Sequence, residues 1–180
     1  MRAFVALDLP ETLVEPITRL QAGLSIGRAV PEDNLHLTLA FLGDIAEADA
    51  AALADLMQTI AMPPIPLCLK GLDIFGGRRP AVLSVMASGD GLVRLHDKIA
   101  HLAREAGIQL ARERFRPHVT IARFRREMSP REHQRLGEFL ALNGTFALDA
   151  APADTVTFYR SHLREAGAIH EPLAQCVLRG

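Results

Sequence analysis

Hydrophobic residues along the chain follow two spacings, which predict both helices and strands. Helical spacing predicts four helices, one that begins at Pro10 or Glu11 and three more at residues 47–60, 92–106 and 129–142. Shorter apolar runs predict strands at residues 3–7, 35–42, 65–69, 81–86, 118–124, 145–148, 155–159 and 174–178. Residues 71–80 are rich in turn-forming residues and are expected to form a loop.

The mixture of these elements predicts an α+β or α/β fold. Short connections between strands favour antiparallel sheets with helices on the outside, which is the α+β class. The sequence contains no low-complexity linker that would mark a boundary between domains. Its length suits a single domain at residues 1–180, or one domain made of two similar lobes.

A short internal repeat connects the two halves of the chain. The sequence Asn-Leu-His-Leu-Thr-Leu-Ala at residues 34–40 returns as Arg-Pro-His-Val-Thr-Ile-Ala at residues 116–122. Both copies have the order His, apolar, Thr, apolar, Ala, and they lie about half a chain apart, as a duplicated lobe would place them. Of the seven histidines, only His36 and His118 have a threonine two residues later. Each could be an ordinary half-buried strand residue, but the paired motif favours a functional site.

Strand alternation predicts which side chains of each copy share a face. In the first copy one face would carry His36, Thr38 and Ala40. The opposite face, which must be core, would carry Leu35, Leu37, Leu39 and Phe41. In the second copy the corresponding polar face would carry His118, Thr120 and Ala122. The small alanine would leave room for a ligand against each strand.

Two imidazoles and two hydroxyls around one cleft suit the cleavage of a phosphodiester. A neutral histidine takes a proton from the attacking water, and a protonated histidine gives one to the leaving oxygen. Both roles are available near neutral pH because histidine ordinarily titrates near pH 6.5. The threonine hydroxyls can donate hydrogen bonds to the non-bridging oxygens. Neither motif contains a carboxylate, and no metal or cofactor is expected.

The charge composition indicates which kinds of nucleic-acid ligand the protein could bind. A formal net charge of −1 with 23% charged residues argues against disorder and against sequence-blind binding of a nucleic-acid duplex. A local basic cluster nevertheless surrounds the second motif and comprises Arg112, Arg114, Arg116, Arg123, Arg125 and Arg126. It is expected to attract RNA phosphates, although a solvated basic face is the alternative.

Cysteine usage and the N-terminus predict a cytoplasmic protein. Cys68 and Cys176 each lie in an apolar stretch, which is typical of buried, reduced thiols. The first apolar run ends at Asp8, too early for a signal peptide, and no segment has the apolar length of a membrane span.

The paired motif and its flanks resemble the two-histidine phosphoesterase superfamily. Within it, the chain is most similar to the RNA 2′,3′-cyclic phosphodiesterases, also called 2′-5′ RNA ligase-like proteins. The matching segments are residues 2–7, 34–43, 76–83 and 115–123. The resemblance implies a bilobal fold of two pseudo-symmetric lobes, with one motif strand from each lobe at a central cleft. It also implies hydrolysis of a terminal 2′,3′-cyclic phosphate to a 2′-phosphomonoester.

The resemblance also implies roles for individual residues. It assigns His36 as the proton donor and His118 as the proton acceptor. It assigns phosphate binding to Thr38, Thr120 and Arg123. Strict alternation would place Arg123 on the face opposite His118, so a bulge or strand end just after Ala122 is needed to bring it to the site.

The chain departs from the family at positions where relatives carry aromatic residues. These are residues 27–30, Ser84, and His170 in place of a common tyrosine. Base-stacking residues therefore stay unassigned. Phe4 and Phe41 are expected to belong to the core, and His170 is expected to lie outside the cleft.

Several alternatives for the function stay open at this level. The same groups would serve a 2′-5′ RNA ligase or a 2′-5′ phosphodiesterase, and the basic cluster alone would serve a non-catalytic RNA-binding module. A metallohydrolase is the most distant alternative. The expected partners are RNA ends or cyclic nucleotides, including tRNA fragments, with no membrane and no obligatory protein partner, and the protein is expected to be a monomer.

Overall fold

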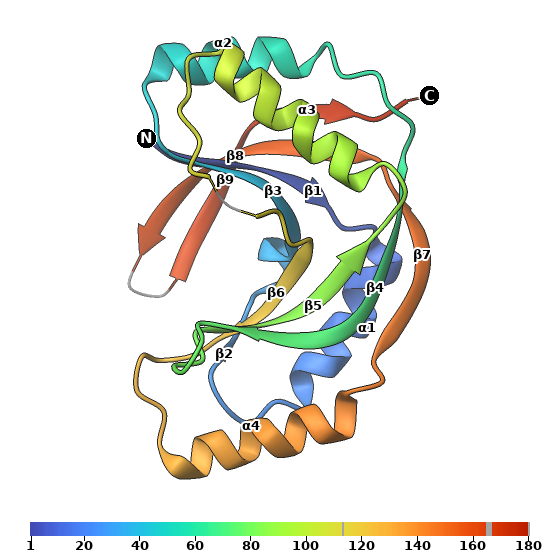
Figure 1. Ribbon diagram of the computed structural model, residues 1–180, viewed down its shortest axis with the longest axis vertical. Helices are drawn as coiled ribbons and strands as arrows, with labels where there is room; N and C mark the ends of the chain where they lie inside the picture. Colours follow the sequence, from blue (N-terminus) through green and yellow to red (C-terminus); the bar gives the residue numbers. More distant parts are fainter. Residues whose placement is uncertain (113, 165–166, 180) are drawn as a thin grey trace.

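A strongly curved antiparallel sheet runs through the whole molecule (Figure 1). The computed structural model describes residues 1–112, 114–164 and 167–179. Its strands are β1 (Arg2–Asp8), β2 (Arg28–Ala29), β3 (His36–Asp44), β4 (Ile65–Phe75), β5 (Val82–Ser88), β6 (His118–Arg123), β7 (Ala147–Ala153), β8 (Thr155–Arg164) and β9 (Gly167–Val177). Its α-helices are α1 (Glu11–Ala22), α2 (Glu47–Met57), α3 (Leu92–Glu105) and α4 (Pro130–Asn143), and a 3-10 turn covers Glu32–Asn34.

The strand order divides the sheet into two lobes. The order is β7-β4-β5-β6-β3-β1-β8-β9, and β2 pairs with β6. The two motif strands, β6 and β3, are therefore neighbours at the centre, but their ladder contains a single partnered pair, Leu37 with Val119. Because the strands separate on both sides of this pair, the sheet opens into two halves with one motif strand at the inner edge of each. The fold is α+β and bilobal, as predicted.

Two helices pack on each lobe (Figure 1). Helices α2 and α3 contact each other, and they contact β9 and β3 of the same lobe. Helix α1 contacts β6 and β7 of the other lobe and buries Leu13, Ile17 and Leu20 there, the residues that helical spacing singled out. Helix α4 begins with a capping box between Ser129 and Glu132. The four predicted helices are thus confirmed.

Several strands extend beyond their predicted ends. The expected loop at residues 71–80 is wrong in its first half, because β4 continues to Phe75. It does so through an irregular register between Leu69 and Leu72, at a point where Gly71 has φ of 81°. Strands β8 and β9 form a hairpin that pairs as far as Arg164 and Gly167. The local sequence of these extensions does not predict a strand. They are strands because their backbones form hydrogen bonds with neighbouring strands.

The two cysteines are free thiols, as expected. Cys176 is buried as predicted, whereas Cys68, which was also predicted to be buried, is half-buried. In the part of the chain that the structure describes, no helix is both long and apolar enough to span a membrane.

Candidate active site

Each motif strand carries one extra residue directly after its threonine. In the pairing of β3 with β1, Ala6 faces Thr38 whereas Val5 faces Ala40. The pairing of β6 with β5 shifts in the same way, with Ser84 opposite Thr120 and Leu83 opposite Ala122. An extra residue of this kind is a β-bulge, and it reverses the alternation of the side chains that follow. The predicted shared face of His, Thr and Ala is therefore wrong for both alanines, which are buried in the core.

The bulges bring a different residue to each polar face. Phe41, predicted to be core, is 64% exposed and lies opposite Phe4 on the cleft side. Arg123 is the equivalent residue of the other strand. Burial is the main cause of the lowered pKa of both His36 and His170, and the charge of Arg123 contributes to both. The bulge needed for Arg123 is present, one residue earlier than its expected place.

A phenylalanine of the same lobe stacks on each motif histidine. His36 stacks on Phe4 with ring centroids 4.8 Å apart and an interplanar angle of 26°. His118 stacks on Phe75 with centroids 4.5 Å apart and an angle of 29°. Phe4 comes from β1, which is adjacent to β3, whereas Phe75 comes from β4, which is separated from β6 by β5. In both lobes the stacked ring fixes the plane of the imidazole.

A hydrogen bond to the backbone also fixes the orientation of each imidazole within its plane. His118 Nδ1 lies 2.6 Å from the carbonyl oxygen of Arg116, two residues before it. A carbonyl oxygen only accepts, so Nδ1 carries a proton and neutral His118 keeps its lone pair on Nε2. His36 makes a backbone hydrogen bond with Asn34, again two residues before it. The equivalent geometry of the two histidines follows from the internal repeat.

Arg116 has a structural partner on each side. Its Nη2 atom lies 2.6 Å from Oδ2 of Asp73, and its guanidinium carbon lies 4.5 Å above the ring centroid of Phe75. This arginine therefore helps to fix the position of Phe75, the ring on which His118 stacks.

The threonines lie on the same face as the histidines. Thr38 and Thr120 are both half-buried, and Ser84 Oγ lies 3.5 Å from Thr120 Oγ1. In an antiparallel pair, the residues beside a partnered pair face each other in crossed order. The Leu37–Val119 pair thus sets His36 on the side of Thr120, and Thr38 on the side of His118. This register places the four motif side chains beside one another where β3 meets β6.

His170 belongs to this site, contrary to expectation. Its ring centroid lies 4.8 Å from that of Phe4 and 5.5 Å from that of His36, both in edge-on geometry. Its Nδ1 atom is buried and has no hydrogen-bond partner among the described residues. The long β8–β9 hairpin brings His170 to the site. The sequence would have indicated this position only if the full length of the hairpin had been predicted.

A polar network behind Phe4 holds the aromatic residues in place. Asp8 accepts hydrogen bonds from the hydroxyls of Thr157 at 2.6 Å and Tyr159 at 3.0 Å. The Tyr159 ring stacks on Phe4 with centroids 5.2 Å apart. Burial raises the pKa of Tyr159 to about 12, so it stays a neutral donor. Asp8 therefore positions Tyr159, which in turn supports Phe4 beneath His36.

The surroundings of His36 disfavour its charged form. Burial lowers its pKa to about 4, and the positive charges of His170, Arg123 and His118 add to this effect. The backbone hydrogen bond with Asn34 acts in the opposite direction. In these surroundings His36 is therefore neutral at neutral pH, and a bound anion would raise its pKa.

This lowered pKa predicts a loss of stability in acid. His36 in the unfolded chain titrates near its ordinary pKa of about 6.5, whereas the folded form titrates at about 4. As the pH falls from about 6.5 to 4, the unfolded state takes up a proton that the folded state does not. We expect the free energy of unfolding of the wild type to fall more over this range than that of His36→Gln. Urea denaturation at a series of pH values measures the difference.

Comparison of the two proteins cancels the contributions of Asp8 and the other titrating groups, because both proteins contain them. Parallel curves for the wild type and His36→Gln would contradict the lowered pKa. An NMR titration of the His36 ring gives the same answer directly.

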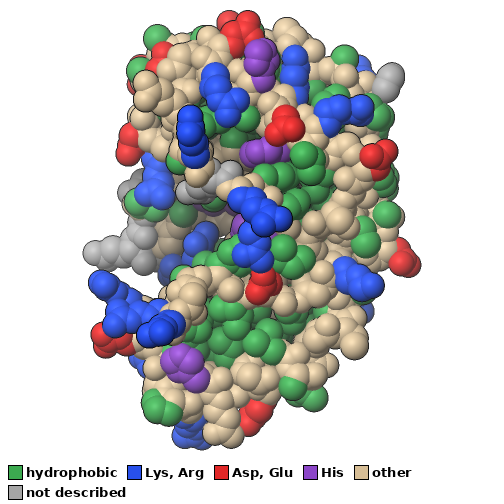
Figure 2. Space-filling view, in the orientation of Figure 1, with side chains coloured by type: hydrophobic (Ala, Val, Ile, Leu, Met, Phe, Trp, Pro, Cys, Tyr) green, Lys and Arg blue, Asp and Glu red, His purple; other side chains and the backbone are tan. Residues whose placement is uncertain are grey.

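Basic side chains surround the site. Figure 2 shows Lys and Arg gathered around a hollow between the two halves of the molecule. In the described part of the chain, no three His, Cys, Asp or Glu side chains are grouped closely enough to hold a metal ion.

Comparisons with known proteins identify relatives of this chain. The 2′-5′ RNA ligase superfamily matches residues 9–166. An RNA 2′,3′-cyclic phosphodiesterase of Aquifex aeolicus is 30% identical over 100% of this chain and 98% of that protein. Another from Escherichia coli is 34% identical over 68% of this chain and 71% of that protein.

Solved structures share the whole fold. The protein TT0787 of Thermus thermophilus superposes with a TM-score of 0.77 at 26% identity, covering 100% of this chain and 99% of that one. Escherichia coli LigT complexed with 3′-AMP superposes with a TM-score of 0.74 at 26% identity, covering 99% of this chain and 98% of that one. Because the family match spans both histidine motifs and elements of both lobes, this chain belongs to the 2′-5′ RNA ligase superfamily.

Proposed function

We propose that this protein hydrolyses 2′,3′-cyclic phosphate ends of RNA to 2′-phosphomonoesters, with His36 and His118 as the acid–base pair and without a metal ion. One observation carries the proposal. Two His-x-Thr motifs lie on adjacent central strands, each with a bulge after its threonine and each with a phenylalanine stacked on its histidine. Curated relatives named RNA 2′,3′-cyclic phosphodiesterase support the choice of substrate.

The proposed reaction is a single displacement at phosphorus. A water oxygen forms a bond to phosphorus while the bond from phosphorus to O3′ breaks. His118 Nε2 takes the proton of the water, and His36 gives a proton to O3′. Thr38 and Thr120 donate hydrogen bonds to the non-bridging oxygens, where negative charge gathers. Since the acid and the base come from different lobes, residues 1–180 work as one bilobal unit.

The electrostatics of the site are compatible with these roles. The hydrogen bond from His118 Nδ1 to the Arg116 carbonyl leaves Nε2 of the neutral ring as an acceptor, which suits a base. The negative charge of a bound cyclic phosphate raises the pKa of His36. His36 therefore takes up the proton that it later donates when the substrate binds. Arg123, which follows the bulge of β6, binds the phosphate.

Phe41 is the best placed side chain for a nucleobase. It is 64% exposed on the cleft side, and its ring lies 6.4 Å from that of Phe4. An exposed aromatic ring next to a phosphate site offers a stacking surface that any base can use.

Hydrolysis of nucleoside 2′,3′-cyclic phosphates in the presence of EDTA tests the proposal. We expect turnover with a bell-shaped dependence on pH, because one histidine must be protonated and the other neutral. Phosphorus NMR of the product should show the 2′-phosphomonoester alone. Turnover that disappears in EDTA and returns with a divalent metal would contradict the mechanism, and a 3′-phosphate product would contradict its polarity.

A further inference from the structure

A second groove lies next to the active site, beside β2 and the start of α4. Its volume is about 410 Å³. The groove is lined by Gly27, Arg28, Phe124, Arg125, Met128 and Glu132. Arg28 on β2 is the direct partner of Arg123 on β6. Partnered residues of adjacent strands project to the same face, so the groove continues the face that carries the proposed phosphate site.

The groove combines apolar and cationic walls. Phe124 and Met128 are half-buried and give it an apolar surface, while Arg28 and Arg125 are exposed on its sides. Aromatic surfaces together with cations that follow the backbone are typical of sites for single-stranded nucleic acid.

The carboxylate among these lining residues is already engaged. Glu132 accepts hydrogen bonds from the backbone N–H of Ser129 at 2.7 Å, from its hydroxyl at 2.8 Å and from Arg125 Nη2 at 2.6 Å. These bonds lower the pKa of Glu132 to about 2. Glu132 therefore holds Arg125 in place through one nitrogen. A guanidinium has five N–H donors, and the others stay available to a phosphate.

We propose that this groove binds the nucleotide that precedes the cyclic end of an RNA strand. The base packs against Phe124 and Met128, and Arg28 and Arg125 hold the phosphate that links it to the terminal nucleotide. This proposal rests on the proposed function, since the cyclic end occupies the histidine site. The groove then makes an oligonucleotide a better substrate than a single cyclic nucleotide.

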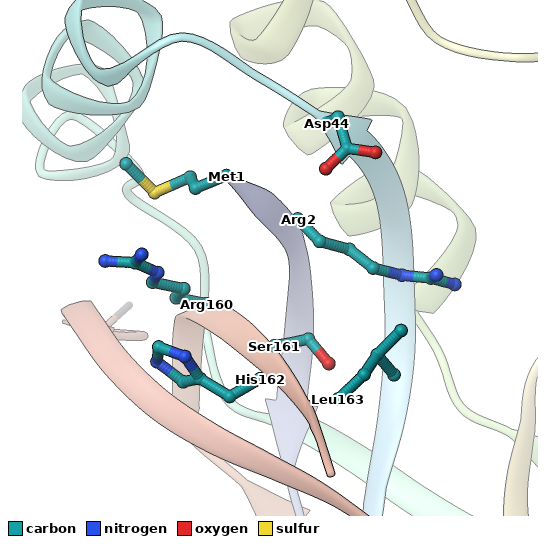
Figure 3. Close-up of a pocket in the computed structure, with 7 residues that line it drawn as sticks. All are labelled: Met1, Arg2, Asp44, Arg160, Ser161, His162 and Leu163. Atoms are coloured by element: carbon teal, nitrogen blue, oxygen red, sulfur yellow. The ribbon is translucent and has the colours of Figure 1, made fainter.

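An alternative path for the RNA strand leads to a pocket at the start of β1. The pocket there is lined by Met1, Arg2, Asp44, Arg160, Ser161, His162 and Leu163. These lining residues include arginines but no Phe, Tyr or Trp. Figure 3 shows that Arg160 and His162 point to one side of the strands whereas Arg2 and Leu163 point to the other. These cations do not converge on one phosphate, so the groove at Arg125 is favoured.

Kinetics of matched substrates test this assignment. For Arg125→Ala we expect kcat/KM on a short RNA with a 2′,3′-cyclic end to fall about tenfold, as for loss of one charged hydrogen bond. On a nucleoside 2′,3′-cyclic phosphate it should stay unchanged. The salt dependence on RNA should also weaken, because one phosphate contact is lost. Arg104→Ala, an exposed arginine of α3, is the matched control for charge and should affect neither substrate.

Two results would overturn the proposal. One is an equal effect of Arg125→Ala on both substrates or on neither. The other is a selective loss on RNA for Arg160→Ala, which would place the strand in the pocket of Figure 3.

A binding experiment separates this proposal from the proposed function. Fluorescence anisotropy measures the affinity of a labelled single-stranded RNA that ends in a 2′-phosphate. Weaker binding by Arg125→Ala than by Arg104→Ala supports the groove even if the wild type turns over no cyclic phosphate. Equal binding by the two variants overturns it.

Discussion

Replacing either His36 or His118 by alanine is expected to lower kcat for nucleoside 2′,3′-cyclic phosphates by a factor of about 10² to 10⁴, the usual contribution of a positioned acid or base. The reason is that each imidazole has its ring plane fixed by a stacked phenylalanine and its orientation fixed by a backbone hydrogen bond. Steady-state kinetics in EDTA measure the loss for each variant.

The matched control is His101→Ala, which removes an exposed imidazole from α3 and should leave kcat unchanged. His36→Asn and His118→Asn keep polar side chains of similar reach and separate loss of chemistry from loss of folding. Activity within a few-fold of the wild type in any variant of the pair would reject the acid–base assignment. RNA binding without turnover in the wild type would instead favour a binding module.

Leu37→Ala is expected to lower the free energy of unfolding by about 2–5 kcal/mol, the usual cost of a cavity at a fully buried leucine. Leu37 and Val119 are both completely buried, and they form the single partnered pair that joins the central strands of the two lobes. The cavity would thus lie directly behind the histidine site. Urea denaturation gives the difference between the variant and the wild type.

Leu142→Ala is the matched control, because Leu142 on α4 is 83% exposed. We expect its effect to stay within about 0.5 kcal/mol, as for ordinary surface substitutions. A cost below about 1 kcal/mol for Leu37→Ala would show that the contact between the lobes closes around the missing atoms.

Local sequence patterns were sufficient for the helices and for the positions of the two motif strands. Leu13, Ile17 and Leu20 repeat at helical spacing and are buried on one side of α1, as predicted. His36 and His118 begin β3 and β6, and their immediate neighbours Leu37 and Val119 are core. These features depend on periods of two and 3.6 residues, which the sequence displays directly.

The assignment of side chains to faces by strict alternation was wrong beyond Thr38 and Thr120, because a bulge follows each of them. A bulge depends on how a strand pairs with its neighbours, β1 for β3 and β5 for β6, and this pairing leaves no mark in the local hydrophobic pattern. Phe41 was therefore assigned to the core although it is exposed on the cleft side. For Arg123 the need for a bulge was recognised only because the resemblance required an arginine at the site.

The sequence by itself thus determined the α+β class, the repeated motif and the pair of histidines, because each follows from residue types at short spacing. Only the tertiary structure decided what surrounds that pair. Phe75 reaches His118 from a strand that was predicted to end earlier, and His170 reaches His36 from the far end of a hairpin. These contacts join residues that are distant in the chain, and the lowered pKa of His36 arises from that assembly, through burial and through charges that long-range strand pairing brings together.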